Sequence, residues 1–277
     1  MNVHVDQELL TSFERTFRAS PTHRIHAPGR INLIGEHIDY TGGLVMPMTI
    51  QLGTTALMQP NGRSEIRVYS ERFKEMAIIR PHQVGTGAQG HWSDYARGLL
   101  LTTTHRSVGH GFDLYVTSNL EMGGLSSSAA FLAVIALANQ WVSGPGHHSL
   151  SLDDTERLAI ALQCQQVENE WIGIPCGIMD PAAILLGGVR QLDCQTLRST
   201  ALRPINKSAT MHNPSKIRSS ATTPVLDASV TPRTPVRPSK IGRAASPSRN
   251  GTIITIQNET QPVPSTAQRG TGATSWL

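Results

Sequence analysis

Short segments in which apolar and polar positions alternate recur along the first 199 residues of the chain, separated by glycine or proline turns. Alternation of this kind is typical of half-buried strands. The first predicted strand ends at Pro28-Gly29, and the last two form a hairpin around Gly187-Gly188. In chain order, the pattern predicts strands at residues 23–27, 53–59, 66–70, 111–118, 183–186 and 189–193.

Other segments have helical patterns. Ser93 is placed as the N-cap of a helix that ends near residue 103. Residues 126–142 are alanine-rich and almost wholly apolar, which indicates a buried helix. Ser151 and Asp154 resemble a capping box for a helix that runs to about residue 171. Strands and helices mixed in this way, with short connections, predict an α+β fold.

The periodic pattern stops after about Ser199, where prolines are interleaved with Ser, Thr, Arg and Lys. This composition buries too little apolar surface to offset the entropy of ordering the backbone, roughly 1–2 kcal/mol per residue. We therefore expect residues 1–199 to form the folded domain and residues 200–277 to be a disordered tail. Residues 252–257 are the one strand-like exception in the tail.

The positive charge of the chain is concentrated in this tail. The formal net charge is +4 and the pI is about 9.2, which taken alone favours a nucleic-acid or membrane partner. Residues 200–277, however, hold ten Lys or Arg against two Asp or Glu, whereas residues 1–199 carry a net charge of −4. Because the tail has almost no aromatic residues to stack on bases, we expect no nucleic-acid partner. A basic nucleic-acid arm is the alternative, and salt-sensitive DNA binding would reveal it.

The sequence shows no sign of export or of a membrane span. No apolar run approaches the roughly 18–20 residues that cross a bilayer, and residues 1–14 lack the pattern of a secretory signal. Cys164, Cys176 and Cys194 lack the close pairing of a disulfide framework. We expect a cytoplasmic monomer with reduced thiols and no membrane partner.

The densest polar motif runs from Pro28 to Gly43 and has the sequence PGRINLIGEHIDYTGG. Its Arg, Glu, His and Asp residues lie between glycines and on either side of the apolar Leu33-Ile34. Such a mixture suits a rigid loop that presents polar groups to a small polyol, with Glu36 and Asp39 accepting hydroxyl hydrogens and His37 donating one. Spacing alone fits a structural polar turn equally well.

A second motif, Gly123-Gly124-Leu125-Ser126-Ser127-Ser128, leads directly into the buried helix. Glycines let a backbone approach a ligand closely, and a helix start offers free N–H groups and the positive end of the dipole. These features predict an anion cradle for a triphosphate. The motif is not a Walker P-loop, because the G-x-x-x-x-G-K-[ST] pattern is absent. A serine-rich N-cap without a ligand is the alternative.

The third motif pairs Glu168 with Gly177-Ile178-Met179-Asp180, twelve residues further on. Glu168 suits Mg²⁺, a hard cation that prefers oxygen ligands, while Asp180 suits a general base that receives a hydroxyl proton. Carboxylate pairs at this spacing are more often solvated surface, so this motif is weak by itself.

Together the three motifs resemble the GHMP superfamily of small-molecule kinases. The first motif is similar to the galactokinase signature G-R-x-N-L-I-G-E-H-x-D-Y-x-G-G, and Cys164-Gln165-Gln166-x-Glu168 precedes Gly-Ile-Met-Asp in the expected order, over residues 20–199. The resemblance implies an N-terminal GHMP-kinase domain with a ribosomal S5 domain 2-like fold. It also implies ATP-dependent phosphorylation of galactose at the anomeric hydroxyl, giving galactose 1-phosphate, with Mg²⁺ as the cofactor.

The same resemblance implies a role for each matching residue. Asp180 is the catalytic base, and Arg30 lowers the pKa of the reacting hydroxyl or steadies the transferring phosphoryl group. Mg²⁺ is held by Ser128 and Glu168. The sugar is bound by Glu36, His37, Asp39 and Gly177. The ATP phosphates are bound by Gly123, Gly124, Leu125, Ser126, Ser127 and Ser128.

The sequence departs from the family pattern in several places. Leu120 and Met122 stand where a proline and a glycine are usual, and we expect Met122 to crowd the phosphate loop. Pro181 stands where glutamine is usual, which predicts extended backbone angles at Asp180. No second glycine-rich motif and no sugar-contacting tyrosine follow Ser199.

This last departure predicts a galactokinase-type domain whose activity is impaired by truncation, with an unrelated tail after it. The alternatives are a kinase for another sugar, such as arabinose or N-acetylgalactosamine, or a sensor that binds galactose and ATP without turnover. Kinetics with a panel of sugars distinguish a kinase for another sugar from a galactokinase. Binding of galactose and ATP without ADP formation identifies a sensor.

Overall fold

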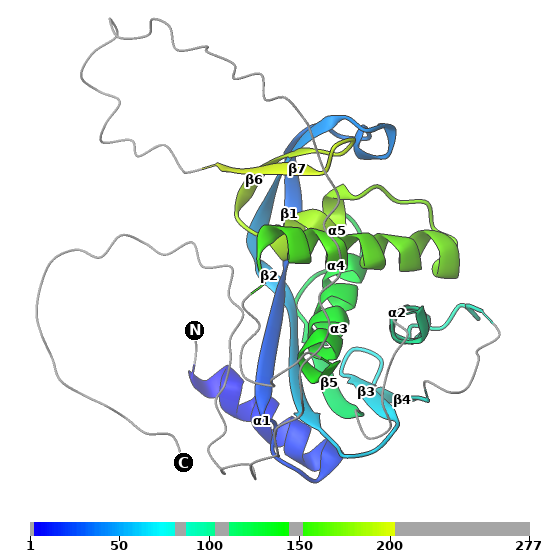
Figure 1. Ribbon diagram of the computed structural model, residues 1–277. Coiled ribbons are helices and arrows are strands. Elements are labelled where there is room, and N and C mark those ends of the chain that lie inside the picture. The colour runs from blue at the N-terminus through cyan, green and yellow to red at the C-terminus, as the bar shows by residue number, and fades with distance from the viewer. Residues whose placement is uncertain (1–2, 81–86, 103–110, 144–151, 203–277) are drawn as a thin grey trace, which may run out of the picture. The chain divides into compact units, whose positions relative to one another are not determined.

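The computed structural model describes residues 3–80, 87–102, 111–143 and 152–202 (Figure 1). The helices are α1 (Val3–Phe17), α2 (Asp94–Thr102), α3 (Ser127–Ser143), α4 (Asp154–Gln166) and α5 (Met179–Leu186). A 3-10 turn, η1, spans Asp39–Thr41 and a π-helical turn, η2, spans Val167–Ile172. The strands are β1 (His23–Ile34), β2 (Leu44–Pro60), β3 (Ile66–Ser70), β4 (Glu75–Ile79), β5 (Phe112–Ser118), β6 (Val189–Asp193) and β7 (Arg198–Leu202).

The strands form one seven-stranded sheet with the order β4-β3-β5-β2-β6-β7, to which β1 adds by pairing with β2. Among the strand pairs in the described ranges, only β3 and β5 run parallel. β2 is the longest strand and pairs with β5 through one half and with β6 through the other. The fold is therefore α+β, as the sequence predicted.

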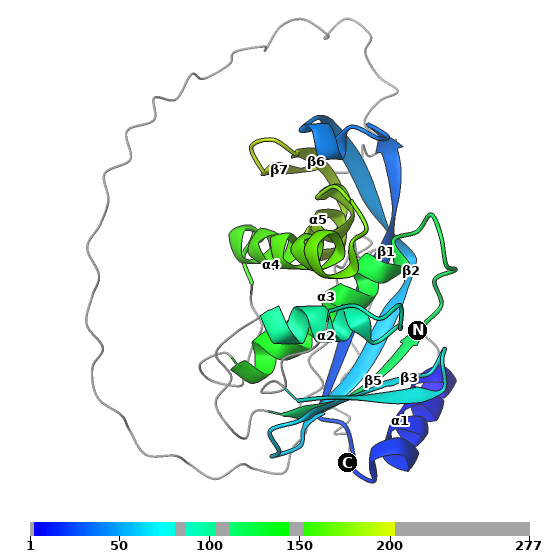
Figure 2. The same ribbon diagram turned by 90° about the vertical axis from the view of Figure 1, so that its right-hand side faces the viewer.

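The two faces of the sheet are covered by different helices. Helices α2 to α5 lie on one side, and α1 lies on the other side at one end of the sheet (Figure 2). Alternation along β2 explains this division, because successive side chains of a strand point to opposite faces. Ala56 and Met58 belong to the main core, whereas Leu57 packs with Phe13 and Phe17 of α1.

Helix α3 lies at the centre of the main core and begins within one residue of its predicted start. Nearly all of its side chains between Ala129 and Val142 are buried. Its alanines keep it narrow, so the sheet and the other helices can pack closely around it. The predicted strand at residues 66–70 and the helix start after Ser93 are also confirmed.

The first predicted strand is longer than the sequence indicated. It was expected to end at Pro28-Gly29, but β1 continues to Ile34. The pairing with β2 shifts register between Pro28 and Arg30, and this irregularity accommodates a residue that has no N–H to donate. Gly29 is required there, since a Cβ atom would lie 2.5 Å from the side chain of Leu120. Arg30 therefore lies in a strand and not in a loop.

The predicted strand at residues 183–186 is wrong, because these residues complete α5. A short apolar run that is buried on all sides has no periodicity to distinguish a strand from a helix. Residues 189–193 do form β6, but the hairpin partner is β7, which extends past the boundary predicted at residue 199. That boundary stays a prediction, and residues 252–257 lie outside the described residues.

Two further local predictions are wrong. Asp180 has helical and not extended geometry, because Pro181 occupies the first turn of α5, where a backbone N–H has no intrahelical partner to lose. The capping box of α4 is formed by Asp153 and Glu156, which bond reciprocally, two residues after the predicted pair. Ser151 itself lies outside the described residues.

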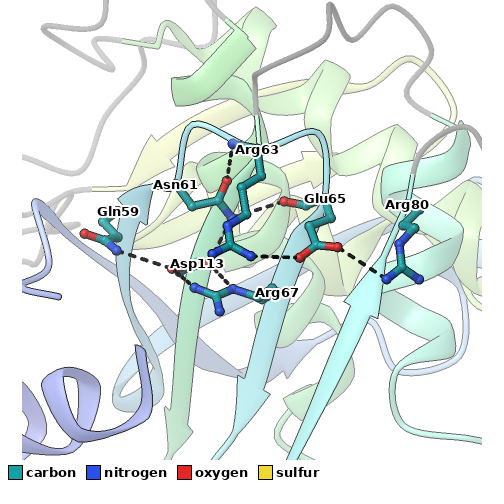
Figure 3. Close-up of polar contacts among 7 residues, drawn as sticks. All are labelled: Gln59, Asn61, Arg63, Glu65, Arg67, Arg80 and Asp113. Carbon is teal, nitrogen blue, oxygen red and sulfur yellow. Dashed lines mark hydrogen bonds and ion pairs between the residues drawn. The ribbon is translucent and has the colours of Figure 1, made fainter. Parts of the chain in front are cut away.

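A polar network ties together β2, β3 and β5 at one end of the sheet (Figure 3). Asp113 of β5 is 1% exposed and accepts hydrogen bonds from Arg67, Asn61 and Gln59. Glu65 pairs with two further guanidinium groups, those of Arg63 and Arg80.

Among the described residues, none of the helices is long and apolar enough to cross a membrane.

Candidate functional site

An arginine–aspartate pair stands at the centre of the site. Arg30 of β1 donates from Nε and from one terminal nitrogen to the two carboxylate oxygens of Asp180, each at 2.7 Å. Its other terminal nitrogen donates to the carbonyl of Gly124, also at 2.7 Å. The Arg30 side chain is 14% exposed and that of Asp180 28%. One guanidinium thus joins the first, second and third motifs.

Ser126 adds a fourth contact to this group. It is 8% exposed and its backbone has a φ of 59°, an uncommon value for a residue with a side chain. Its hydroxyl donates to Oδ2 of Asp180 at 2.5 Å. The sequence assigned Ser126 to the ATP phosphates, but its hydroxyl is directed to the carboxylate. Strained backbone of this kind is often retained at functional sites.

The start of α3 offers the anion cradle that the second motif predicts. The first intrahelical bond runs from the N–H of Ala130 to the carbonyl of Ser126, so the N–H groups before Ala130 have no intrahelical partner. Gly123 and Gly124 adopt φ values of 99° and 78°, which favour glycine. A Cβ atom on either would meet open space, so this stretch of backbone faces solvent.

An aromatic pocket adjoins the cradle. It has a volume of about 240 Å³, and its lining includes Ser127 and Ser128 of the cradle together with Trp92 and Phe131. The Trp92 ring stacks on Phe73 and meets Phe131 edge-on, with centroids 5.7 and 6.2 Å apart. Met122, which was expected to crowd the phosphate loop, is 71% exposed and lines this pocket.

The first motif ends in a tight turn beside the third motif. Glu36 and His37 have exposed side chains, and His37 has a φ of 59°. Asp39 begins η1 and is half-buried against Gly177, where a Cβ atom would overlap its carboxylate. Only glycine fits at position 177 without a shift of its neighbour. The structure therefore places Asp39 and Gly177, both predicted sugar ligands, in direct contact.

Glu168 lies within η2 and is 6% exposed. The thiol of Cys176 donates to its Oε2 at 3.3 Å. Burial raises the pKa of the Cys176 thiol, and the negative charges of Glu168, Asp180 and Asp39 raise it further. The pKa of Tyr95 is also raised, first by burial and then by Glu168. Tyr95 lines the aromatic pocket from α2, and α2 packs against η2, the turn that carries Glu168.

The chemistry of Ser128 and Glu168 fits Mg²⁺. In the described parts of the chain, no three His, Cys, Asp or Glu side chains gather closely enough to hold a metal by themselves. Mg²⁺ needs no such cluster, because it keeps several waters and binds one or two protein oxygens together with substrate phosphates. The hydroxyl of Ser128 at the cradle and the buried carboxylate of Glu168 in η2 are ligands of the kind that Mg²⁺ prefers.

Sequence reasoning missed several residues of the site. The aromatic lining of the pocket comes from β3–β4, α2 and α3 and carries no common motif. Asn169, which bonds to the backbone of Cys176, was also missed, and Gln165, which bonds there too, was named only as part of a motif and without this contact. Their four-residue spacing places both on one face of a helix, and this was the available signal.

The fold and the site define a GHMP kinase domain. Residues 94–188 match the family described as GHMP kinases N terminal domain. Residues 11–60 match the galactokinase galactose-binding signature. Residues 11–60 and 94–188 therefore carry a galactose-binding signature and an N-terminal domain of the galactokinase type within the GHMP kinases, which confirms the resemblance inferred from the sequence.

Known galactokinases are similar to this chain over roughly two thirds of its length. A galactokinase of Exiguobacterium sibiricum is 38% identical over 204 residues, which cover 70% of this chain and 50% of the relative. One of Thermococcus kodakarensis is 41% identical over 181 residues, 63% of this chain and 48% of the relative. The structure of Lactococcus lactis galactokinase complexed with galactose has a TM-score of 0.61 and 30% identity, covering 71% and 51%. The chain thus spans about half the length of the relatives it matches.

Proposed function

We propose that this chain carries a galactose- and ATP-binding site of a galactokinase-type sugar kinase. The reaction transfers the γ-phosphoryl group of ATP to the anomeric hydroxyl of galactose and gives galactose 1-phosphate and ADP. The observation that carries the proposal is the set of bonds from Arg30 to Asp180 and to Gly124. These bonds bring the proposed base within one side chain of the phosphate cradle.

Asp180 acts as the base in this proposal. It takes the proton of the anomeric hydroxyl as the hydroxyl oxygen bonds to the γ-phosphorus and the bond to ADP breaks. Arg30 and Ser126 hold the carboxylate in place, and a carboxylate has acceptor capacity left for a substrate hydroxyl. The guanidinium also neutralises charge that develops on the transferring group.

ATP is held in two places. Its phosphates bind the open backbone from Gly123 to Ser128 at the start of α3, and its base enters the aromatic pocket beside Trp92. Mg²⁺, held by Ser128 and Glu168, neutralises phosphate charge when it is bound. Galactose lies against Asp39 and Gly177, with Glu36 and His37 binding its outer hydroxyls.

Calorimetric titration of the full chain tests the proposal directly. Galactose and a magnesium–ATP analogue are each expected to bind, and arabinose and N-acetylgalactosamine serve as the comparison sugars. Failure of both galactose and nucleotide to bind would contradict the proposal. Tighter binding of arabinose or N-acetylgalactosamine would show that this sugar, and not galactose, is the substrate. ADP release is measured in parallel, because residues 200–277 carry neither the second glycine-rich motif nor the tyrosine expected there. Binding without ADP release would favour a sensor.

A further inference from the structure

The loop between η2 and α5 is held at one residue by two amide side chains. The N–H of Cys176 donates to Oδ1 of Asn169 at 2.7 Å, and its carbonyl accepts from Nδ2 of the same side chain at 3.3 Å. The carbonyl also accepts from Nε2 of Gln165 at 3.1 Å. Asn169 thus pairs with the peptide groups of Cys176 as a neighbouring strand would, and we call this set of three bonds the amide clamp.

The start of the same loop is fixed separately. The N–H groups of Gly173 and Ile174 both donate to the carbonyl of Glu168. Residues 173–175 have exposed side chains, so core packing does not fix the middle of the loop. The amide clamp is the next attachment along the chain, and the residues that follow it enter the site.

Two contacts to the proposed site branch from the clamped residue. On one side, the Cys176 thiol donates to Oε2 of Glu168, the carboxylate assigned to Mg²⁺. On the other side, Gly177 follows directly and has no space for a Cβ atom against Asp39, which is assigned to the sugar. A displacement of Cys176 therefore changes both contacts together.

We propose that Asn169, assisted by Gln165, is a positioning residue that sets the metal-side contact of Cys176 and the sugar-side contact of Gly177 at once. The inference rests on the proposed function, because it uses the roles of Glu168 and Asp39. The π-helical turn η2 supports it, since such turns are frequent at functional sites. There Glu168 is buried towards the site while Asn169, the next residue, is exposed and reaches the loop.

The test compares Asn169→Ala with Gln166→Ala in the full chain. Gln166 lies on the same helical segment and bonds only to exposed Glu170 in the described structure, which makes it a matched control. Asn169→Ala removes both bonds of this side chain to Cys176 and frees the loop to leave its position in the site, so the expected effect is about a tenfold loss of affinity. We expect this loss for galactose and for magnesium–nucleotide in Asn169→Ala, and neither loss in Gln166→Ala, as measured by calorimetry.

Two variants of the loop separate the branches. Cys176→Ala is expected to weaken magnesium–nucleotide binding and leave galactose binding nearly unchanged, and Cys176→Ser, which keeps a donor, should restore it. Gly177→Ala is expected to weaken galactose binding and to leave magnesium–nucleotide binding nearly unchanged. A purely structural role for the loop would weaken both ligands equally in every variant, and that result would overturn the proposal.

The remaining outcomes also decide. If Asn169→Ala retains normal affinity for both ligands, the amide clamp has no positioning role even though the site is real. If Asn169→Ala fails to fold, Gln165→Ala removes a single donor, and an unchanged affinity for both ligands there refutes the proposal. If the unaltered chain binds neither galactose nor nucleotide, the proposed function fails and the clamp proposal fails with it.

Discussion

Two arginine–aspartate pairs in this molecule have nearly the same geometry and different surroundings. Arg67 donates to both oxygens of Asp113, at 2.7 and 2.5 Å, and Arg30 donates to both oxygens of Asp180, at 2.7 Å. Asp113 is 1% exposed, whereas the side chain of Asp180 is 28% exposed. Figure 3 shows that the donors to Asp113 come from neighbouring parts of one sheet.

The additional contacts of each pair show how they differ. Asp113 accepts further bonds from Asn61 and Gln59, and Arg67 stands directly opposite it in the β3–β5 register. Its carboxylate is buried among these protein donors, so the network stabilises the sheet and offers no access to a ligand. Arg30, in contrast, joins a strand to the start of α5 and to a glycine loop that faces solvent. A bidentate pair therefore marks a candidate site only where its carboxylate stays accessible beside an open backbone.

The comparison predicts its largest effect for Asp180→Asn. The change keeps the shape of the side chain but removes the base. In a full-length version of the protein that continues into the second half of a galactokinase, galactose-dependent ADP release should therefore fall by about 10²–10⁴-fold. Thermal unfolding of the variant should stay close to that of the unaltered chain, because the carboxylate is partly solvated. Turnover within a factor of two of the unaltered chain would remove Asp180 from the role of base.

The opposite pattern is expected for Asp113→Asn. Removing one partner of a buried ion pair leaves the other charge uncompensated, and we expect a loss of about 3 kcal/mol in the free energy of unfolding. Urea denaturation measures this loss. Folded Asp113→Asn protein should bind galactose and nucleotide as the unaltered chain does. A large stability loss in Asp180→Asn together with a small one in Asp113→Asn would reverse the comparison.

The sequence predicted part of this difference. The resemblance to galactokinases placed Arg30, Asp180 and the glycine–serine loop in one site, and the structure brings them into contact. The alanine-rich run defined α3 almost to the residue. The sequence could not predict that Asp113 is buried, because its neighbours Asn61 and Arg67 reach it only after strand pairing.

Other parts of the site could not be predicted for physical reasons. The amide clamp depends on η2, a π-helical turn, and no hydrophobic period in the sequence encodes such a turn. The aromatic pocket depends on the packing of Phe73, Trp92 and Phe131 from distant segments. The missed continuation of β1 had a local cause, since Pro28-Gly29 is a turn signal that here forms an irregularity within a strand.

A smaller effect is expected from Trp92→Leu. This change removes the ring but keeps an apolar side chain in the wall of the pocket, so nucleotide affinity should fall about tenfold. Galactose affinity should not change, because Trp92 lies in the pocket beside the cradle and not in the turn that carries Asp39. Calorimetry with each ligand measures both values. Equal losses for the two ligands would show that the pocket belongs to the general fold.

The smallest expected effect is a pH dependence of stability that comes from His23, which belongs to neither arginine–aspartate pair. Burial lowers the pKa of His23, whose ring lies 3.8 Å from that of Trp141, from 6.5 to about 4. The folded state therefore binds this proton more weakly than the unfolded state, and the stability contributed by neutral His23 is lost as pH falls from about 6.5 towards 4. Burial and Arg24 also lower the pKa of His26.

Because His23 is partly exposed, solvent screening reduces its contribution to about 1 kcal/mol, or roughly 2–4 °C in Tm for a domain of this size. Thermal unfolding of His23→Gln, followed from pH 7 to pH 4, should show a shallower decrease than that of the unaltered chain, with the contribution of His26 retained. An identical pH profile for His23→Gln and the unaltered chain would show that the acid-sensitive group is not His23.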